Sequence, residues 1–369
     1  MRILLSAIGR RLAVAFRKVA QRPGDDAQPE PRISRVRYLS RRWLSLAATA
    51  VLAVFVAAAA RGQDRVAFGL DWKAEAEYGG YYQALATGIY AKHGLDVTIK
   101  EGGPQVNNML LLMAGRLDFN LGGGRAIEFA QQNLPFLAVA AIFQKDLAVL
   151  IAHPGQGNDS FTALKGKPIM IGADARVGWW RFLAAKFDYD DSQIRPYTFN
   201  LGPFLADKKA IQQGYASSEP FLIRQKTGVE PVVLPLSAAG YQGYANIITT
   251  SARLIRERPD IVQRFVDASI EGWYSYLYGD PTPANRLIMQ ANSEMPADLI
   301  DFGRKTMIAR GIVDSGDAKT LGIGAMTDAR WQAFYQSMTA VGVYKPGIDI
   351  EKAYTTRFVD KRVGMEVER

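Results

Sequence analysis

Hydrophobic and polar positions change rhythm several times in the first third of the chain. A short apolar run at 66–72 is followed by bulky residues at helical spacing over 78–94, and then by strand-like alternation over 95–100. A second helical pattern runs over 104–113, and an apolar strand at 117–122 follows it. Strand, helix, strand, helix, strand predicts a parallel α/β unit whose polar and glycine residues collect where strands end.

The rest of the chain repeats this alternation and then becomes helical. Apolar runs at 136–143 and 148–152 predict two more buried strands. The next predicted elements are a strand at 168–172, a loop at 173–178, a helix at 179–187, a strand at 195–199, a helix at 203–213, and strands near Val232 and at 246–251. Proline and acidic helix starts then predict several helices, of which 259–278 is the longest.

This pattern predicts an α/β protein with two lobes behind an N-terminal leader of residues 1–62. We expect the first lobe to comprise 63–153 together with 248–369, which includes the C-terminal helices. The second lobe is expected to comprise 154–247, because a Gly-, Asn- and Asp-rich turn follows Pro154. A solute would bind between the lobes, and a hinge motion would close them over it.

The net charge of +9 lies in the leader and argues against nucleic-acid binding. Residues 1–62 hold 12 Lys and Arg and 3 acidic residues, so 12 − 3 = +9. The remainder holds 45 − 12 = 33 basic and 36 − 3 = 33 acidic residues, which balance. A chain without a basic excess outside its leader lacks the electrostatic footprint of a nucleic-acid-binding protein.

The leader has the layout of an export signal. A basic segment ends in Arg41-Arg42, an uncharged apolar run covers 44–60, and Ala58-Ala59-Ala60 supplies small residues for cleavage. We therefore expect a periplasmic protein, and the arginine pair is similar to a twin-arginine export address. If the run 44–60 is retained instead, it would anchor the protein to the inner membrane as a solute sensor.

The chain offers little material for catalysis or metal binding. It has no Cys, which excludes disulfides, thiolate metal ligands and thiol nucleophiles, and its two histidines are His93 and His153. No metal constellation and no Ser-His-Asp set can be assembled from these residues. We therefore predict no catalytic residue, no metal site, no cofactor and no enzymatic activity.

Several segments, in this order and spacing, are similar to one protein family. They are Leu70-Asp71-Trp72, Gly80 to Ala84, Gly88-Ile89-Tyr90, His93 to Val97, Gly115 to Asp118, Pro135 to Ile142, and Gly214 to Pro220. Over about residues 64–280 the chain resembles the NMT1/THI5-like (SsuA/THI5-type) periplasmic substrate-binding proteins of ABC importers. The resemblance implies the two-lobed type II periplasmic binding protein fold, a small-molecule solute and an ABC membrane permease as partner. We expect a monomer.

The first group of candidate ligand residues comes from the first lobe. Asp71 and Trp72 end a strand and would offer a solute an acceptor and a stacking face. Alternatively, Trp72 is a core aromatic and Asp71 caps the next helix. Tyr78 stands where the family pattern usually has His, so it can stack but cannot act as a base. Gly122, Gly123, Gly124 and Arg125 join a strand to a helix, which suits an anion or a carbonyl group or simply a tight turn.

The second group lies in or near the second lobe. Arg176 and Trp179 belong to the stretch after the strand at 168–172, and Tyr241 precedes the return to the first lobe. Tyr215 and Glu219 lie in a turn, and the resemblance implies that a Tyr and a Glu at this spacing hold a heterocycle. A carboxylate can accept two amino hydrogens at once, although Glu219 also suits the first turn of a helix.

Two ligand classes remain open at this stage, and a third function, an enzyme, is disfavoured. The aromatic and acidic candidates favour a flat heterocycle such as a thiamine-pyrimidine precursor, whereas Gly122 to Arg125 and Arg176 favour a sulfonate- or nitrate-type anion. The third is a pyrimidine-phosphate synthase of the same family. The resemblance implies that such an enzyme needs a Lys and a His after the Asp-containing strand and a Cys-rich iron motif. Residues 118–130 contain no Lys or His, and the chain has no Cys.

Overall fold

The computed structural model describes residues 62–103, 106–122 and 125–366, and residues 63–369 form one compact unit. The export leader that the sequence predicts, with its arginine pair and apolar run, lies outside the described residues, as do Gly123 and Gly124. Within the described ranges, no helix is long and apolar enough to cross a membrane.

The first of two five-stranded sheets has the strand order β2-β1-β3-β10-β4. Its strands are β1 (Asp64–Gly69), β2 (Leu95–Lys100), β3 (Phe119–Gly122), β4 (Phe136–Phe143) and β10 (Ala245–Ser251). β1 pairs in parallel with β2 and β3, as the sequence pattern predicts, whereas β10 runs antiparallel to β3 and β4. The carboxyl ends of β1, β2 and β3 therefore meet at one edge of this sheet.

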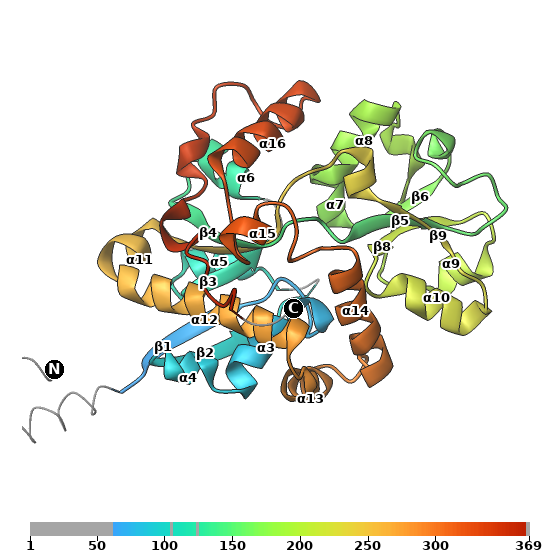
Figure 1. Ribbon diagram of the computed structural model, residues 1–369. Helices are drawn as coiled ribbons and strands as arrows, with labels where there is room; N and C mark the ends of the chain where they lie inside the picture. Colours follow the sequence, from blue (N-terminus) through green and yellow to red (C-terminus); the bar gives the residue numbers. More distant parts are fainter. Residues whose placement is uncertain (1–61, 104–105, 123–124, 367–369) are drawn as a thin grey trace, which may run out of the picture. The chain divides into compact units, whose positions relative to one another are not determined.

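The second sheet has the order β7-β6-β8-β5-β9. Its strands are β5 (Ala148–Ala152), β6 (Ile169–Ile171), β7 (Ile194–Pro196), β8 (Ile211–Tyr215) and β9 (Val232–Pro235). Figure 1 labels four of these strands, β5, β6, β8 and β9. The chain passes between the sheets twice, after β4 and before β10. Two α/β sheets joined by two crossings confirm the predicted fold class.

The place of β5 corrects the expected first segment of the first lobe, which ran to residue 153. Its register pairs Val149 with Gly214 of β8 and with Pro235 of β9, so the strand belongs to the second sheet. β4 and β5 are both buried apolar runs a few residues apart. Such runs show that a strand is buried, but they do not show which sheet it joins.

The helices differ from the sequence-based expectation in four places. The pattern over 78–94 forms η1 (Ala76–Tyr78), α3 (Gly79–Ala86) and α4 (Ile89–Lys92), and the pattern over 104–113 forms α5 (Asn108–Met113). The segment expected to be a helix over 203–213 divides into α9 (Gly202–Ala206) and the strand β8, and the loop expected at 173–178 contains α7 (Ala173–Val177). The sequence pattern does not reveal this strand because Gln212 and Gln213 are polar. Gln212 is nevertheless buried, because other parts of the fold pack over it. The other short elements of this lobe are η2 (Thr162–Leu164), α8 (Trp179–Phe187), η3 (Asp191–Gln193), α10 (Glu219–Thr227) and η4 (Leu236–Ala239).

The helices outside the second sheet come from both ends of the described sequence. The N-terminal ones are η1 (Ala76–Tyr78), α3 (Gly79–Ala86), α4 (Ile89–Lys92), α5 (Asn108–Met113) and α6 (Ala126–Gln131). The C-terminal ones are α11 (Ala252–Glu257), α12 (Pro259–Tyr278), α13 (Thr282–Ala291), α14 (Ala297–Ala309), α15 (Ala318–Leu321), α16 (Asp328–Ala340), η5 (Ile350–Lys352) and η6 (Thr356–Phe358). The sequence predicts α12 and α8 with these bounds, because an N-terminal Pro and a long apolar face mark α12.

The packing of α12 against α3 fixes the start of the first lobe. Phe265 of α12 stacks on Phe119 of β3 with ring centroids 4.1 Å apart. On the α3 side, a Cβ at Gly79 would lie 2.1 Å from the Tyr276 ring, and one at Gly80 would lie 2.3 Å from the Trp273 indole. Only glycine permits this approach, so the loop that precedes α3 is held firmly against the core.

Candidate functional site

The loop between β1 and α3 carries the first predicted residues and is pinned on both sides. The Gly102 N–H donates to the carbonyl of Trp72 at 2.9 Å, and a Cβ at Gly102 would lie 2.4 Å from the carbonyl of Leu70. Asp71 is exposed, Trp72 is half-buried and Tyr78 is buried. The Tyr78 hydroxyl donates to Asp71 Oδ1 at 2.9 Å, so the structure brings these two predicted residues together.

Four carboxyl groups gather around this loop and interact electrostatically: Asp71, Glu75, Glu77 and Glu219, called here the cleft acids. Burial raises the pKa of the Glu75 carboxyl well above its usual range, and the charges of Glu77, Glu219 and Asp71 add to the effect. Burial likewise raises the pKa of Glu77. The nearby Lys73 is exposed and pairs with Glu294 at 2.6 Å, so it does little to neutralise the cleft acids.

Glu75 differs from the other cleft acids in its bonding. In the part of the chain that the structure describes, its carboxylate accepts no hydrogen bond, although its backbone carbonyl accepts one from Tyr78. The buried Glu77 instead accepts from the Ser217 hydroxyl, which follows β8 in the second sheet. Glu75 is therefore the cleft acid with the most unused acceptor capacity.

Glu219 begins α10 and is held by its own lobe. Its carboxylate accepts from the Tyr215 N–H at 2.8 Å, from the Ser218 hydroxyl at 2.6 Å and from the Tyr197 hydroxyl at 3.3 Å. These bonds place a negative charge at a helix N-terminus, where the helix dipole stabilises it. Three of its acceptor positions are thus used inside the protein, which leaves less capacity for a solute than the sequence suggested.

Aromatic rings face these acids from both lobes. The rings of Trp72 and Phe199 lie 4.6 Å apart at an interplanar angle of 48°, and Phe199 lies 5.1 Å from Tyr197. Tyr215 is exposed at 46% and has Asp71 and Glu75 among its charged neighbours. Trp72 with Phe199 and Glu77 with Ser217 are therefore two direct contacts between the first and second lobes.

The predicted basic residues lie outside this acidic and aromatic cluster. Arg125 is exposed and pairs with Glu128 at 2.9 Å, one turn along α6, while Gly122 ends β3. Arg176 is exposed and lines a small cavity of about 280 Å³ with Asp191 and other second-lobe residues. Trp179 is half-buried against the core.

Tyr241 precedes β10, on the second crossing between the sheets. It is buried and packs edge to face against Phe182 and Phe334, with ring centroids 5.5 Å and 5.4 Å away. Tyr241 also lines a cavity of about 850 Å³ whose walls come from both crossing segments and from the residues after α14. No other residue that the sequence singled out lines this cavity within the described part of the chain.

Sequence reasoning missed four residues of the cluster: Glu75, Glu77, Tyr197 and Phe199. The two acids had a usable signal, because Asp71, Glu75 and Glu77 fall within seven positions directly after a strand. The aromatic pair had none, since a Tyr and a Phe after a short edge strand are ordinary core residues in most proteins. Within the described ranges, no group of three or more acidic or histidine side chains is placed to hold a metal ion.

Comparisons with known proteins agree with this architecture. The NMT1/THI5-like family profile matches residues 75–284. The riboflavin-binding protein RibY of Chloroflexus aurantiacus is 26% identical over 309 residues, which cover 80% of this chain and 86% of that protein. The periplasmic aliphatic sulphonate binding protein SsuA of Escherichia coli superposes with a TM-score of 0.59 at 11% identity, covering 79% of this chain and 91% of that one.

A second solved structure gives the same result. The alkanesulfonate-binding protein SsuA of Xanthomonas axonopodis pv. citri, bound to MOPS, superposes with a TM-score of 0.59 at 13% identity. It covers 80% of this chain and 99% of that one. At such identities the likeness shows the periplasmic binding protein fold alone. The family profile spans 284 − 75 + 1 = 210 of the 369 residues, and the chain therefore belongs to the NMT1/THI5-like family.

Proposed function

We propose that this protein is the solute-binding component of an ABC import system and holds a flat solute without negative charge between its two lobes. The observation that carries the proposal is the combination of four cleft acids with aromatic rings from both lobes. Carboxylates accept hydrogen bonds from hydroxyl or amino groups, and aromatic faces stack on planar rings. Together they suit an uncharged or cationic heterocycle.

The same charges argue against a sulfonate or nitrate ligand. Two like charges 4 Å apart repel by about 4 kcal/mol at an effective dielectric constant of 20. Arg125 and Lys73 are exposed and already paired with acids, so neither compensates for that repulsion. The anion alternative therefore has less support than the heterocycle, even though the SsuA structures share the fold.

Among flat solutes we place riboflavin first. RibY is a riboflavin-binding protein by name, and riboflavin has a planar three-ring system with an uncharged hydroxylated side chain. The rings would stack on Trp72, and the hydroxyl groups would donate to Asp71 or Glu75. A thiamine-pyrimidine precursor comes second, because the Glu219 carboxylate that should hold its amino group already accepts three bonds.

We propose binding without turnover. The nitrogen Nε2 of His93 lies 3.0 Å from Glu271, and that of His153 lies 2.8 Å from the carbonyl of Phe204. Neither histidine is among the cleft residues, and the chain has no Cys to supply a nucleophile. Incubation with iron, pyridoxal phosphate and a reductant should yield no pyrimidine phosphate, and product formed in proportion to protein would contradict this.

The proposal includes export to the periplasm and a membrane permease as partner. Mass spectrometry of the exported protein should find its N-terminus between Arg61 and Asp64. A chain that keeps residues 44–60 would instead support the anchored solute sensor. Changing Arg41 and Arg42 to Lys should block export if the pair is a twin-arginine address, whereas unchanged export would indicate the general pathway.

Titration of riboflavin, an aminopyrimidine and an alkanesulfonate into the purified protein tests the ligand class. Trp72→Ala should weaken binding of the flat solute by about 2 kcal/mol or more, because a buried stacking aromatic is a typical hot spot. Phe187→Ala is a matched control, since this half-buried ring packs on Phe161 within the second lobe. Glu75→Gln should weaken the riboflavin complex and strengthen any sulfonate binding. Tight sulfonate binding by the unmodified protein would overturn the proposed ligand class.

A further inference from the structure

The cavity of about 850 Å³ beside Tyr241 is separate from the proposed solute site. Its walls come from the first crossing at Gln144 to Leu147, from the second crossing between Pro235 and Gln242, and from the loop between α14 and α15 with the start of α16. All four cleft acids are described residues, and none of them lines this cavity. Cavities of this size hold small organic molecules in other proteins.

Two of the charged groups that line the cavity are already bonded within the protein. Arg330 of α16 donates to Gln144 Oε1 at 2.9 Å, and its guanidinium carbon lies 4.1 Å from the centroid of the Tyr244 ring. Asp317 accepts from the hydroxyl groups of Tyr244 and Thr327, each at 3.2 Å. These contacts use both charges and hold both side chains in place, so a solute must pair with other groups.

Three other charged groups in the cavity wall keep bonding capacity. Lys145 Nζ donates to the Arg310 carbonyl at 2.9 Å, which leaves two of its N–H groups for other acceptors, and the Arg310 guanidinium forms no ion pair with another described residue. Asp146 accepts from the Ala148 N–H at 2.8 Å through Oδ1 alone. Burial, and then the charge of Asp146, raise the pKa of the Tyr241 hydroxyl, so this acid lies close to the Tyr241 ring. Both signs of charge are therefore available to a solute.

Apolar side chains supply much of the remaining wall. Leu147 comes from the first crossing, Val149 from β5, Ile312 from the loop after α14, and Tyr241 from the second crossing. An apolar group that enters the cavity would leave water and contact these side chains, which stabilises a complex by about 25 cal/mol for each Å² of apolar surface removed from water. The cavity thus offers two cations, one acid and an apolar surface to the same molecule.

We propose that this cavity is a second binding site, and that it takes a zwitterionic solute with an apolar body, such as an apolar α-amino acid. The carboxylate of the solute pairs with Lys145 and Arg310, its ammonium group pairs with Asp146, and its apolar part contacts Leu147 and Ile312. A simple anion would leave Asp146 unpaired, and a simple cation would leave Lys145 and Arg310 unpaired. Charge-assisted hydrogen bonds at both ends therefore select the zwitterion.

Three related compounds test the pairing of charges by isothermal titration calorimetry. Tryptophan carries both charged groups, indole-3-propionate lacks the amino group, and tryptamine lacks the carboxylate. Tryptophan should bind about tenfold more tightly than either of the other two, because each of them leaves a charged side chain without its partner. Equal affinity for all three compounds, or no binding of tryptophan at millimolar concentration, overturns the proposal.

Charge variants assign each end of the solute. Arg310→Gln should weaken tryptophan about fivefold and leave tryptamine unchanged, whereas Lys305→Gln is the control, because this exposed lysine of α14 pairs with Asp301 and does not line the cavity. Asp146→Asn keeps an acceptor for the Ala148 N–H, and it should weaken tryptophan but not indole-3-propionate. Equal losses for all compounds in either variant would overturn the assigned pairing.

A filled cavity tests the location of the site. Ala329→Trp places a large side chain in the cavity from an exposed position of α16, and Ala333→Trp, one turn further along the same helix and outside the cavity, is the matched control. Ala329→Trp should weaken tryptophan about tenfold or more and leave riboflavin binding unchanged. Unchanged tryptophan affinity overturns the proposed location. If Ala329→Trp unfolds at a lower temperature than the control, the two charge variants decide the location. Failure of riboflavin to bind the unmodified protein would contradict the proposed function alone.

Discussion

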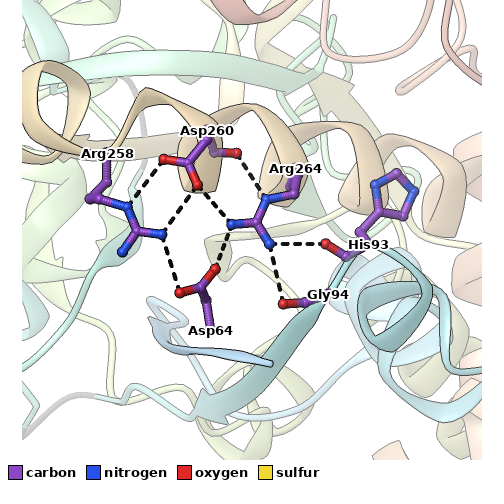
Figure 2. A network of polar contacts seen from close by, with 6 residues as sticks. All are labelled: Asp64, His93, Gly94, Arg258, Asp260 and Arg264. Carbon is purple, nitrogen blue, oxygen red and sulfur yellow. Dashed lines mark hydrogen bonds and ion pairs between the residues drawn. The ribbon is translucent and has the colours of Figure 1, made fainter. Parts of the chain in front are cut away.

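Acidic side chains are paired with arginines at the start of β1, whereas they cluster without such partners after its end. At its start, Asp64 accepts from Arg264 at 2.6 Å and from Arg258 at 3.1 Å, and both arginines also bind Asp260 (Figure 2). After its end, the cleft acids repel one another, and the charge of Lys73 offsets this only weakly. The six residues of β1 thus connect a network whose negative charges are neutralised by arginines to a cluster whose negative charges are not.

The pKa directions of the two groups reflect this difference. Hydrogen bonds from Arg258 lower the pKa of Asp260 to about 2, while burial raises the pKa of Glu75 well above its usual range. Arg264 also donates to the carbonyls of His93 and Gly94, so the network joins β1, the turn before β2 and α12 (Figure 2). The compensated end stabilises the fold, whereas the uncompensated end brings carboxyl groups together at some expense in stability, as the proposed solute site requires.

Removing the centre of the network should have the largest effect. Arg264→Ala should lower the free energy of unfolding by about 2 kcal/mol, because a half-buried guanidinium loses bonds to two carboxylates and two carbonyls. Urea unfolding at pH 7 measures this. Arg253→Ala is the control, since its fully exposed pair with Glu257 should contribute little to stability. Equal losses in both variants would show that the network adds nothing beyond surface pairing.

Breaking the bond between the lobes should have the next largest effect. Ser217→Ala should cost about 1–2 kcal/mol in unfolding, because the buried Glu77 carboxyl loses its donor. Ser160→Ala, in an exposed turn, serves as the control and should change stability little. A smaller loss in Ser217→Ala than in the control would mean that water replaces the hydroxyl.

Neutralising a cleft acid should stabilise the protein. Because the folded state raises the pKa of Glu75, its contribution to stability is fully present in acid and is lost as pH rises through the folded pKa. Glu75→Gln should therefore gain about 1 kcal/mol at pH 7, and this gain should disappear toward pH 4. Thermal unfolding across this range measures it. A variant less stable than the unmodified protein at pH 7 would contradict the uncompensated cluster.

The smallest effect is expected at the other end of β1, with the opposite pH dependence. The lowered pKa of Asp260 adds stability above its unfolded value near 3.8, and that stability is lost as pH falls toward about 2. Since Asp260 is largely exposed, Asp260→Asn should cost only about 0.5 kcal/mol at pH 7, and this cost should shrink as pH falls through about 2. A cost that does not shrink in acid would assign the effect to packing rather than to charge.

The sequence predicts much of the fold because local patterns determine many of its elements. β4, β5, α8 and α12 have the predicted bounds, since each is a continuous apolar run or a clear amphipathic helix. β8 and the sheet that β5 joins depend on contacts distant in sequence, which no local pattern contains. Tertiary context decides such cases.

The candidate site was predictable to a smaller degree. Asp71, Trp72 and Tyr78 were found because they follow a strand in a loop that resembles the family pattern, and Tyr215 and Glu219 join them electrostatically. Phe199 could not be found, because its place in the cluster arises from a partner in the other lobe. Arg125 and Arg176 looked like anion ligands in the sequence, but one pairs with Glu128 and the other faces a separate cavity.

The glycine pair that begins α3 limits where this protein can change. A single methyl group at Gly79 or Gly80 would collide with Tyr276 or Trp273. The contact between α3 and α12 therefore does not tolerate a stepwise increase in side-chain size at these two positions. The loop that carries Asp71 and Trp72 is directly attached to this contact. In the proposed site, new solute preferences can therefore arise by substitution of loop residues while the packing of α3 on α12 holds the loop in place. A redesign of the proposed site can leave α3 and α12 unchanged.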